Sequence, residues 1–207
     1  MTMPLPGELL SALVAFAFVA SITPGPNNTM LLASGVNYGF RRTIPHMLGI
    51  GIGFGVMMLL VGLGIGQIFA QAPLLYTVLK IASVAYMLWL AWHIATAGPF
   101  SASAEQAAAG PMTFLKAAAF QWVNPKAWSM CLTAVSVYTV PSAYLLSMLT
   151  ITLVFVAVNI PSVSVWTVFG VSLRRMLGDP VRVRIFNIAM ALALVASLWP
   201  IAAEFWA

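Results

Sequence analysis

The sequence predicts an all-α integral membrane protein. We expect six transmembrane helices, forming a 3+3 inverted repeat in which the first and fourth spans are broken. Of the 207 residues, 62% are hydrophobic and only 6% are charged, whereas a soluble domain carries about 25% charged residues. A soluble core of this size could not bury so much apolar surface, and six spans of roughly 20 residues would use most of the chain. No segment remains for a soluble catalytic domain, so we expect no enzyme.

The first half of the chain holds three predicted spans, and we assign residues 1–97 to a first three-helix repeat. The stretch Met1 to Gly7 has no Lys or Arg. A cleaved signal peptide begins with a basic region, so we expect the first span to be retained. The predicted spans are Leu9 to Ala33 with an internal break, Ile44 to Ala70, and Leu74 to Ala97.

The second half follows the most polar stretch of the sequence, Gly98 to Gly110, which predicts a cytoplasmic linker over residues 98–112. We assign residues 113–207 to a second three-helix repeat. Its predicted spans are Thr113 to Val140 with a second break, Tyr144 to Val171, and Ile185 to Trp199.

The basic residues predict the orientation, because Lys and Arg of short loops stay in the cytoplasm. We therefore place the odd-numbered loops in the cytoplasm and both termini outside, in the periplasm. Two halves of three spans then have opposite orientation, which is the condition for an inverted repeat. The basic residues in or beside the odd loops are Arg41, Arg42, Lys116, Arg174, Arg175, Arg182 and Arg184.

Two helix breaks in corresponding places of the two halves are the best sequence indication of a transporter's substrate site. A proline has no N–H, so it releases the carbonyl one turn earlier as an acceptor for an ammonium group. The carbonyls concerned are those of Ala20, Ile22 and Gln121. The breaks read Thr23-Pro24-Gly25-Pro26-Asn27-Asn28 and Asn124-Pro125-Lys126.

Each break also restarts a helix, whose free N–H groups and partial positive charge suit a carboxylate. Asn is a strong N-cap residue and Pro is favoured at the first helical position. We therefore expect Asn124 to cap the second restart and Asn27 or Asn28 to cap the first. Acceptors for an ammonium beside donors for a carboxylate predict a site for a zwitterionic amino acid.

Lys126 adds a full positive charge to the second break. A lysine near mid-membrane costs about 2.5–3.5 kcal/mol on insertion scales. A substrate carboxylate or a cluster of carbonyls would offset that cost. The structural alternative is a lysine that extends to the membrane surface, if the fourth span lies less deep than drawn.

The predicted substrate-binding residues gather around the breaks. Trp122 flanks the second break, and either contacts substrate or fills the bundle. Asn159 lies beside Pro161 at a third polar kink. One proline kink alone is usually structural, but two kinks with Asn and Lys favour function. The full set is Pro24, Gly25, Pro26, Asn27, Asn28, Trp122, Asn124, Pro125, Lys126 and Asn159.

These motifs resemble those of the LysE/RhtB family of bacterial amino-acid exporters. The resemblance implies six spans in the bacterial inner membrane, export from the cytoplasm, and energy from the proton-motive force. The third span looks most like that of members that export cysteine, O-acetylserine, homoserine or threonine. The matching stretches are residues 23–28, residues 39–42, Gly49 with Gly53, residues 86–92 and residues 121–127.

The absence of acidic residues within the predicted spans limits the range of expected substrates. It does not identify the group that couples transport to protons. Exporters of basic amino acids in this family carry an acidic residue in the second span, whereas Gly49 to Gly55 has none. We therefore predict a small neutral amino acid. No acidic residue lies at mid-membrane to relay protons. His46, His93, Lys126 and the substrate amine remain candidates for coupling.

An ion or metal carrier that uses the same broken-helix site is the alternative function. Such a carrier needs intramembrane acids or thiols, and these are lacking. We expect no metal and no cofactor. We also expect no nucleic-acid partner, since the net charge of +5 comes mainly from the arginines beside spans. Glycines four residues apart, such as Gly49 and Gly53, indicate close helix packing. Glycine-rich faces allow a homodimer without establishing one, and lipid is the remaining expected partner.

Overall fold

The computed structural model describes residues 5–66, 73–96, 110–176 and 179–199. The described part of the first half contains four α-helices, with a π-helical turn at Val61–Ile65 after the third. Asp, Glu, Lys and Arg are rare in these helices, so the apolar residues are continuous enough to favour membrane insertion. The helices are α1 (Gly7–Ile22), α2 (Pro26–Tyr38), α3 (Phe40–Leu60) and α5 (Pro73–Thr96).

The second half repeats this mixture of broken and long helices. Its 3-10 turns are Gln121–Val123 and Pro141–Ala143. Within the described residues every regular element is helical, which confirms the predicted all-α class. The helices are α7 (Phe114–Phe120), α8 (Pro125–Tyr138), α9 (Tyr144–Met176) and α10 (Pro180–Ala196).

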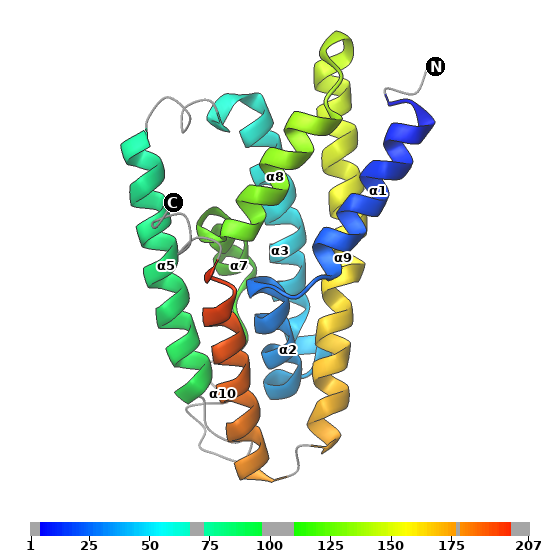
Figure 1. Cartoon of the computed structure of the whole chain (residues 1–207). Helices are drawn as coiled ribbons and strands as arrows, with labels where there is room; N and C mark the ends of the chain where they lie inside the picture. Colours follow the sequence, from blue (N-terminus) through cyan, green and yellow to red (C-terminus); the bar gives the residue numbers. More distant parts are fainter. Residues whose placement is uncertain (1–4, 67–72, 97–109, 177–178, 200–207) are drawn as a thin grey trace.

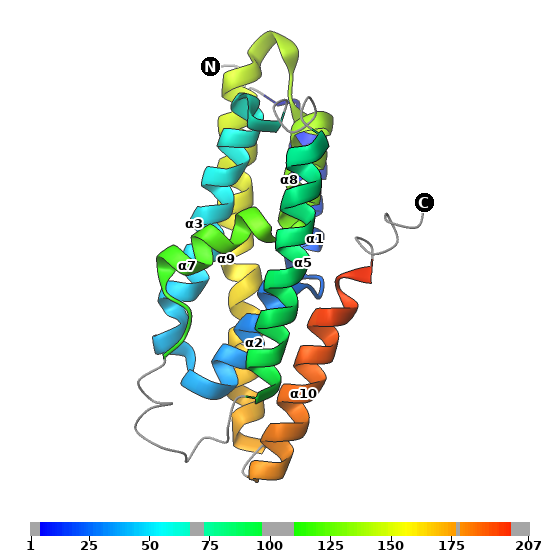
Figure 2. The ribbon, with the colours of Figure 1, turned by 90° about the vertical axis from the view of Figure 1, so that its left-hand side faces the viewer.

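The helices run up and down a single elongated bundle (Figures 1 and 2). From the top in Figure 1, α1 descends to mid-height and α2 continues downward from there. Then α3 ascends, α5 descends, α7 and α8 ascend together, α9 descends the whole height, and α10 ascends. The chain direction of the second half is therefore opposite to that of the first.

Among the described residues, two stretches are long and apolar enough to cross a membrane by length and composition alone, Phe40–Ile65 and Pro141–Arg174. The pair α1 and α2, bent by 54° at its break, makes a third if it is counted as one span. Many large apolar side chains also face outward, among them Leu115 and Leu153. Such a surface suits lipid better than water. The count of six spans and the inverted repeat stay predictions.

Both predicted breaks are present, and other boundaries differ in detail. The first span is interrupted between Ile22 and Pro26, and the fourth between Val123 and Pro125. The α9 helix continues through Pro161 to Met176, beyond the predicted end at Val171. The predicted second-span end at Ala70 and residues 98–109 of the predicted linker lie outside the described residues.

The predicted sixth span corresponds to α10, which begins at Pro180, five residues before the predicted start at Ile185. Asp179 Oδ1 accepts a hydrogen bond from the Val181 N–H at 2.9 Å, and Pro180 occupies the first helical position. These are the ordinary features of a helix start. The prediction was wrong because the arginines in this stretch were interpreted as loop residues.

Glycines hold α3 and α9 tightly to their neighbours, as the glycine spacing predicts. A Cβ at Gly49 or Gly53 would collide with the backbone of α7, and one at Gly51 or Gly55 with side chains of α9. The α3 helix is therefore clamped between α7 and α9. Similarly, a Cβ at Gly170 of α9 would collide with the Leu32 carbonyl oxygen of α2.

Candidate functional site

The two helix breaks lie against each other at mid-height of the bundle (Figure 1). The Lys126 ammonium donates to the Thr23 carbonyl oxygen at 2.7 Å, to Thr23 Oγ1 at 2.9 Å and to the Pro24 carbonyl oxygen at 3.2 Å. These acceptors lie at the C-terminal end of α1, where the helix dipole is negative. The protein's own carbonyls thus offset the charge of this lysine.

Gly25 makes room for that lysine. Its backbone is extended, with φ 176°, so glycine is not required here by backbone conformation. A Cβ at this position, however, would lie only 2.8 Å from Lys126 Cδ. Any larger residue would push the lysine side chain away from the end of α1.

A second contact between the breaks joins Asn27 to Gln121. Asn27 Nδ2 donates to Gln121 Oε1 at 2.9 Å, and Gln121 Nε2 donates back to Asn27 Oδ1 at 3.2 Å. Gln121 Nε2 also donates to the Ala117 carbonyl oxygen at 2.9 Å, and its side chain is fully buried. The reciprocal pair fixes the start of α2 against the end of the α7 segment.

The predicted cap of the second restart is confirmed, and that of the first is wrong. Asn124 Oδ1 accepts from the Lys126 N–H at 3.1 Å, and Pro125 is the first residue of α8. The α2 helix begins after Gly25 with no side-chain cap. Asn28 instead donates to the carbonyl oxygens of Ser21 at 2.8 Å and Thr23 at 2.7 Å. Since α2 already starts at Pro26, its asparagines lie within the first turn and cannot cap it.

The carbonyls that the prolines were expected to release to a substrate already have donors within the protein. Thr23 Oγ1 donates to Ala20 O at 3.1 Å, Trp166 Nε1 to Ile22 O at 3.1 Å, and Asn124 N to Gln121 O at 3.2 Å. Backbone acceptors in a membrane interior must be satisfied, and side chains and the broken backbone do so here. The expectation that these three carbonyls would be open to an ammonium was therefore wrong for this conformation.

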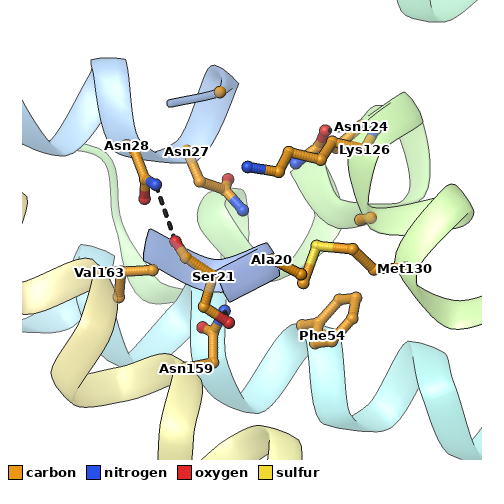
Figure 3. A pocket seen from close by; sticks show the side chains of 12 residues that line it. Ala20, Ser21, Asn27, Asn28, Phe54, Asn124, Lys126, Met130, Asn159 and Val163 are labelled. Carbon is orange, nitrogen blue, oxygen red and sulfur yellow. Dashed lines mark hydrogen bonds between the residues drawn. The ribbon is translucent and has the colours of Figure 1, made fainter. Parts of the chain in front are cut away.

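A cavity lies between the breaks, with about 320 Å³ of space not filled by atoms (Figure 3). Residues of α1, α2, α3, α8 and α9 line it, so both halves of the chain contribute. The polar lining residues are Ser21, Asn27, Asn28, Asn124, Lys126 and Asn159.

Two amide oxygens in this lining have no hydrogen-bond partner among the described residues: Asn28 Oδ1 and Asn159 Oδ1. Asn28 is 3% exposed and Asn159 4% exposed. Both amide nitrogens are engaged, that of Asn159 with Ser21 Oγ at 3.1 Å. An unsatisfied buried acceptor costs about 1–3 kcal/mol. A guest with N–H donors, such as an ammonium group, would remove that cost at both oxygens.

The structure brings most of the predicted site residues to this cavity. Pro24 takes part through its carbonyl oxygen, and Pro26 and Pro125 start the two helices. Trp122 does not line the cavity. Its carbonyl oxygen accepts from Trp128 Nε1 at 2.9 Å, and the two rings pack edge to face at 6.0 Å. Trp122 thus packs against Trp128 in this structure, and its contact with substrate stays a prediction.

Sequence reasoning missed several residues of the site. The Gln121 side chain was not predicted, because this residue was named only for its carbonyl oxygen and within a motif, although its position one turn before Asn124 was a usable signal. Ser21 and Phe54 had weaker signals, since Ser21 is a small polar residue before the first break and Phe54 lies between two glycines. Met130 had none, because only the packing of α8 brings it to the cavity.

Comparison with known proteins identifies the family. Residues 18–198 match the LysE type translocators. The cysteine/O-acetylserine efflux protein of Escherichia coli (strain K12) is 37% identical over 142 residues, and that of Salmonella typhimurium (strain LT2) is 36% identical over 142 residues. Both alignments cover 67% of this chain and 70% of the relative. No solved structure matches the chain. Because the family match spans most of its length, this membrane protein belongs to the LysE type translocators, which are transporters rather than enzymes.

Proposed function

We propose that this protein exports small neutral amino acids from the bacterial cytoplasm across the inner membrane. The single observation that supports this most strongly is the arrangement of donors and acceptors around the cavity. Lys126 brings a positive charge to one side, and the cavity is also lined by Asn28 and Asn159, whose amide oxygens have no partner among the described residues. The efflux proteins that are 36–37% identical to this chain support the same class of cargo.

The proposed binding mode follows from these groups. The substrate carboxylate would take the Lys126 ammonium, with the first N–H groups of α8 nearby. The substrate ammonium would donate to Asn28 Oδ1 and Asn159 Oδ1. No acidic residue lines the cavity, so a basic side chain would find no countercharge there. Cysteine, O-acetylserine, homoserine and threonine fit this description.

We propose six transmembrane spans for the transport cycle, with residues 1–97 and 113–207 as inverted repeats and residues 98–112 as a cytoplasmic linker. The opposite chain directions of the two halves support this division (Figure 1). Both termini would lie in the periplasm. The α2–α3 junction, the end of α9 and the start of α10 lie in the lower part of Figure 1, and these three stretches carry all six arginines. Rocking of the repeats about the cavity would then expose it alternately to each side.

We further propose that the proton-motive force drives export, and that His46 is the better of the two histidine candidates. His46 is buried in α3, and both its ring nitrogens lack a partner among the described residues. His93 is exposed, contacts the Trp89 carbonyl oxygen at 3.1 Å and stacks on the Trp89 ring. A buried imidazole can gain a proton only when its surroundings change, which would tie protonation to conformation.

Efflux from proteoliposomes preloaded with a panel of labelled amino acids tests this function, with and without an imposed proton gradient. Selective release of small neutral amino acids, accelerated by the gradient, is the expected result. An absence of amino-acid release from folded protein would contradict it. In that case the alternative of an ion carrier would be tested in the same vesicles with alkali and divalent cations.

A further inference from the structure

Phe54 of α3 is the largest apolar side chain that lines the cavity. Figure 3 shows its ring on the opposite side from Asn27, Asn28 and Lys126. The other apolar lining residues are small or flexible: Ala20 and Ala127 carry only a methyl group, and Met130 has three rotatable side-chain bonds. A hard limit on what enters this end of the cavity can therefore come only from the phenyl ring or from Val163.

The backbone that carries Phe54 cannot retreat from the cavity. On one side of it, a Cβ at Gly53 would collide with the backbone of Ala118 in α7. On the other side, a Cβ at Gly55 would lie 2.5 Å from Val156 Cγ2 in α9. Both contacts are closer than any residue with a side chain would allow, so α3 is fixed at this height by its two neighbours.

The ring itself is also held from behind. Phe54 is 2% exposed, and its ring packs edge to face on Phe155 with 5.5 Å between centroids. Phe155 packs in the same way on Phe16 at 5.9 Å, and Phe16 stacks on Tyr138 at 5.9 Å. In a close-packed interior, a ring backed by a row of other rings has no alternative position.

We propose that Phe54 sets the upper size of the substrate side chain. This inference rests on the proposed function and deepens it. With the carboxylate at Lys126 and the ammonium at Asn28 and Asn159, the side chain points toward the phenyl ring. Small neutral side chains would be accepted in front of the ring. Leucine, methionine and phenylalanine would be excluded, because in this conformation Phe155 packs against the ring and α7 and α9 hold its backbone.

The test is a change of substrate selectivity after the Phe54 side chain is replaced by a smaller one. Phe54→Ala and the milder Phe54→Leu are reconstituted in proteoliposomes loaded with equal concentrations of labelled cysteine, threonine, leucine and phenylalanine. Fitting one additional methylene in a hydrophobic pocket changes discrimination about 10–200-fold. We expect the ratio of leucine to threonine efflux to rise at least about tenfold in Phe54→Ala and less in Phe54→Leu.

The matched control is Phe120→Ala, which removes an equally buried phenyl ring that does not line the cavity. It should lower the melting temperature without changing the efflux ratio. If a folded Phe54 variant exports the same amino acids in the same ratio as the wild type, the size limit is not set by Phe54. If the wild type itself exports no amino acid, the proposed function fails instead, so the two failures are distinguishable.

Discussion

Asn27 and Gln121 exchange two side-chain hydrogen bonds, at 2.9 and 3.2 Å, across the meeting point of the two halves of the chain. The residues are 94 positions apart in the sequence. Because each amide uses both its donor and its acceptor, the pair is satisfied only when the two broken helices face each other. It therefore reports directly on whether the breaks are in contact.

The first prediction concerns this pair. Gln121→Leu should destabilise the protein, because it removes the partner of both polar atoms of the half-buried Asn27 amide, at up to about 1–3 kcal/mol each. Asn27→Leu should do the same, and the double variant should cost less than the sum of the two. Melting temperatures in detergent of the wild type, the two single variants and the double variant measure this double-mutant cycle. Additive effects of the two substitutions would show that the amides do not interact.

Lys126 is predicted to be required for transport and not for folding. Lys126→Ala removes the charge-assisted contacts to a carboxylate, each about 1.5–3 kcal/mol, so efflux should fall at least about tenfold. Lys116→Ala is the matched control, because the Lys116 side chain is exposed and outside the cavity. Wild-type efflux from Lys126→Ala would remove this lysine from the substrate site.

The unpaired oxygen of Asn159 is predicted to recognise the substrate ammonium. Asn159→Leu should weaken binding of an amino acid about tenfold or more, since hydrogen bonds to charged groups contribute about 1.5–3 kcal/mol. It should leave unchanged the binding of the same acid without its amino group. Asn37→Leu is the control, because the Asn37 amide donates to the Ala33 carbonyl oxygen of its own helix, and Asn37 lies outside the cavity. Equal weakening for both compounds would contradict recognition of the ammonium.

Close packing of α2 on α9 predicts a strong effect at Gly170. A Cβ there collides with the Leu32 carbonyl oxygen and would lie 3.0 Å from the Val36 nitrogen. Gly170→Ala should therefore destabilise the protein by about 1–3 kcal/mol or more, through overpacking. Gly7→Ala, where a Cβ meets nothing within 4 Å, should leave the melting temperature unchanged. Similar melting temperatures for the two variants would contradict this packing.

Proton coupling is predicted to depend on His46 and not on His93. His46→Gln should keep downhill efflux but lose most of its acceleration by an imposed proton gradient. His93→Gln, at an exposed position with a local backbone contact, should retain that acceleration. Gradient-driven efflux in both variants would assign coupling to another group, with the substrate amine and Lys126 as the remaining candidates.

Local chemistry made the helix breaks and one of the caps predictable. Proline cannot complete the hydrogen bond to the preceding turn, so the interruptions before Pro26 and Pro125 follow from the residues themselves. Asn124 caps α8 by the same local rules. Asp179 and Pro180 carried an equally local signal for the start of α10, which was outweighed by the arginines that follow them.

Contacts between distant segments were not predictable in this way. The Ile22 carbonyl finds its donor in Trp166, 144 positions later, and Asn28 turns back to the end of α1. No periodicity or motif specifies such partners, because they depend on how α1, α2 and α9 pack. The cavity lining at Phe54 and Met130 was missed for the same reason. The residues that interrupt helices were predicted from the sequence. The residues that form contacts between distant helices were not.

The oxygens of Thr23 and Pro24 that accept hydrogen bonds from the Lys126 ammonium compete with any carboxylate for it. A carboxylate that reaches this ammonium must displace the oxygens at the end of α1, so binding is an exchange of one set of partners for another. Its free energy is the difference between the two sets, which keeps affinity modest even where individual contacts are strong. Modest affinity suits a carrier that must give up its cargo on the far side. The same oxygens that oppose binding of a carboxylate favour its dissociation, because they bind the Lys126 ammonium again as the carboxylate leaves.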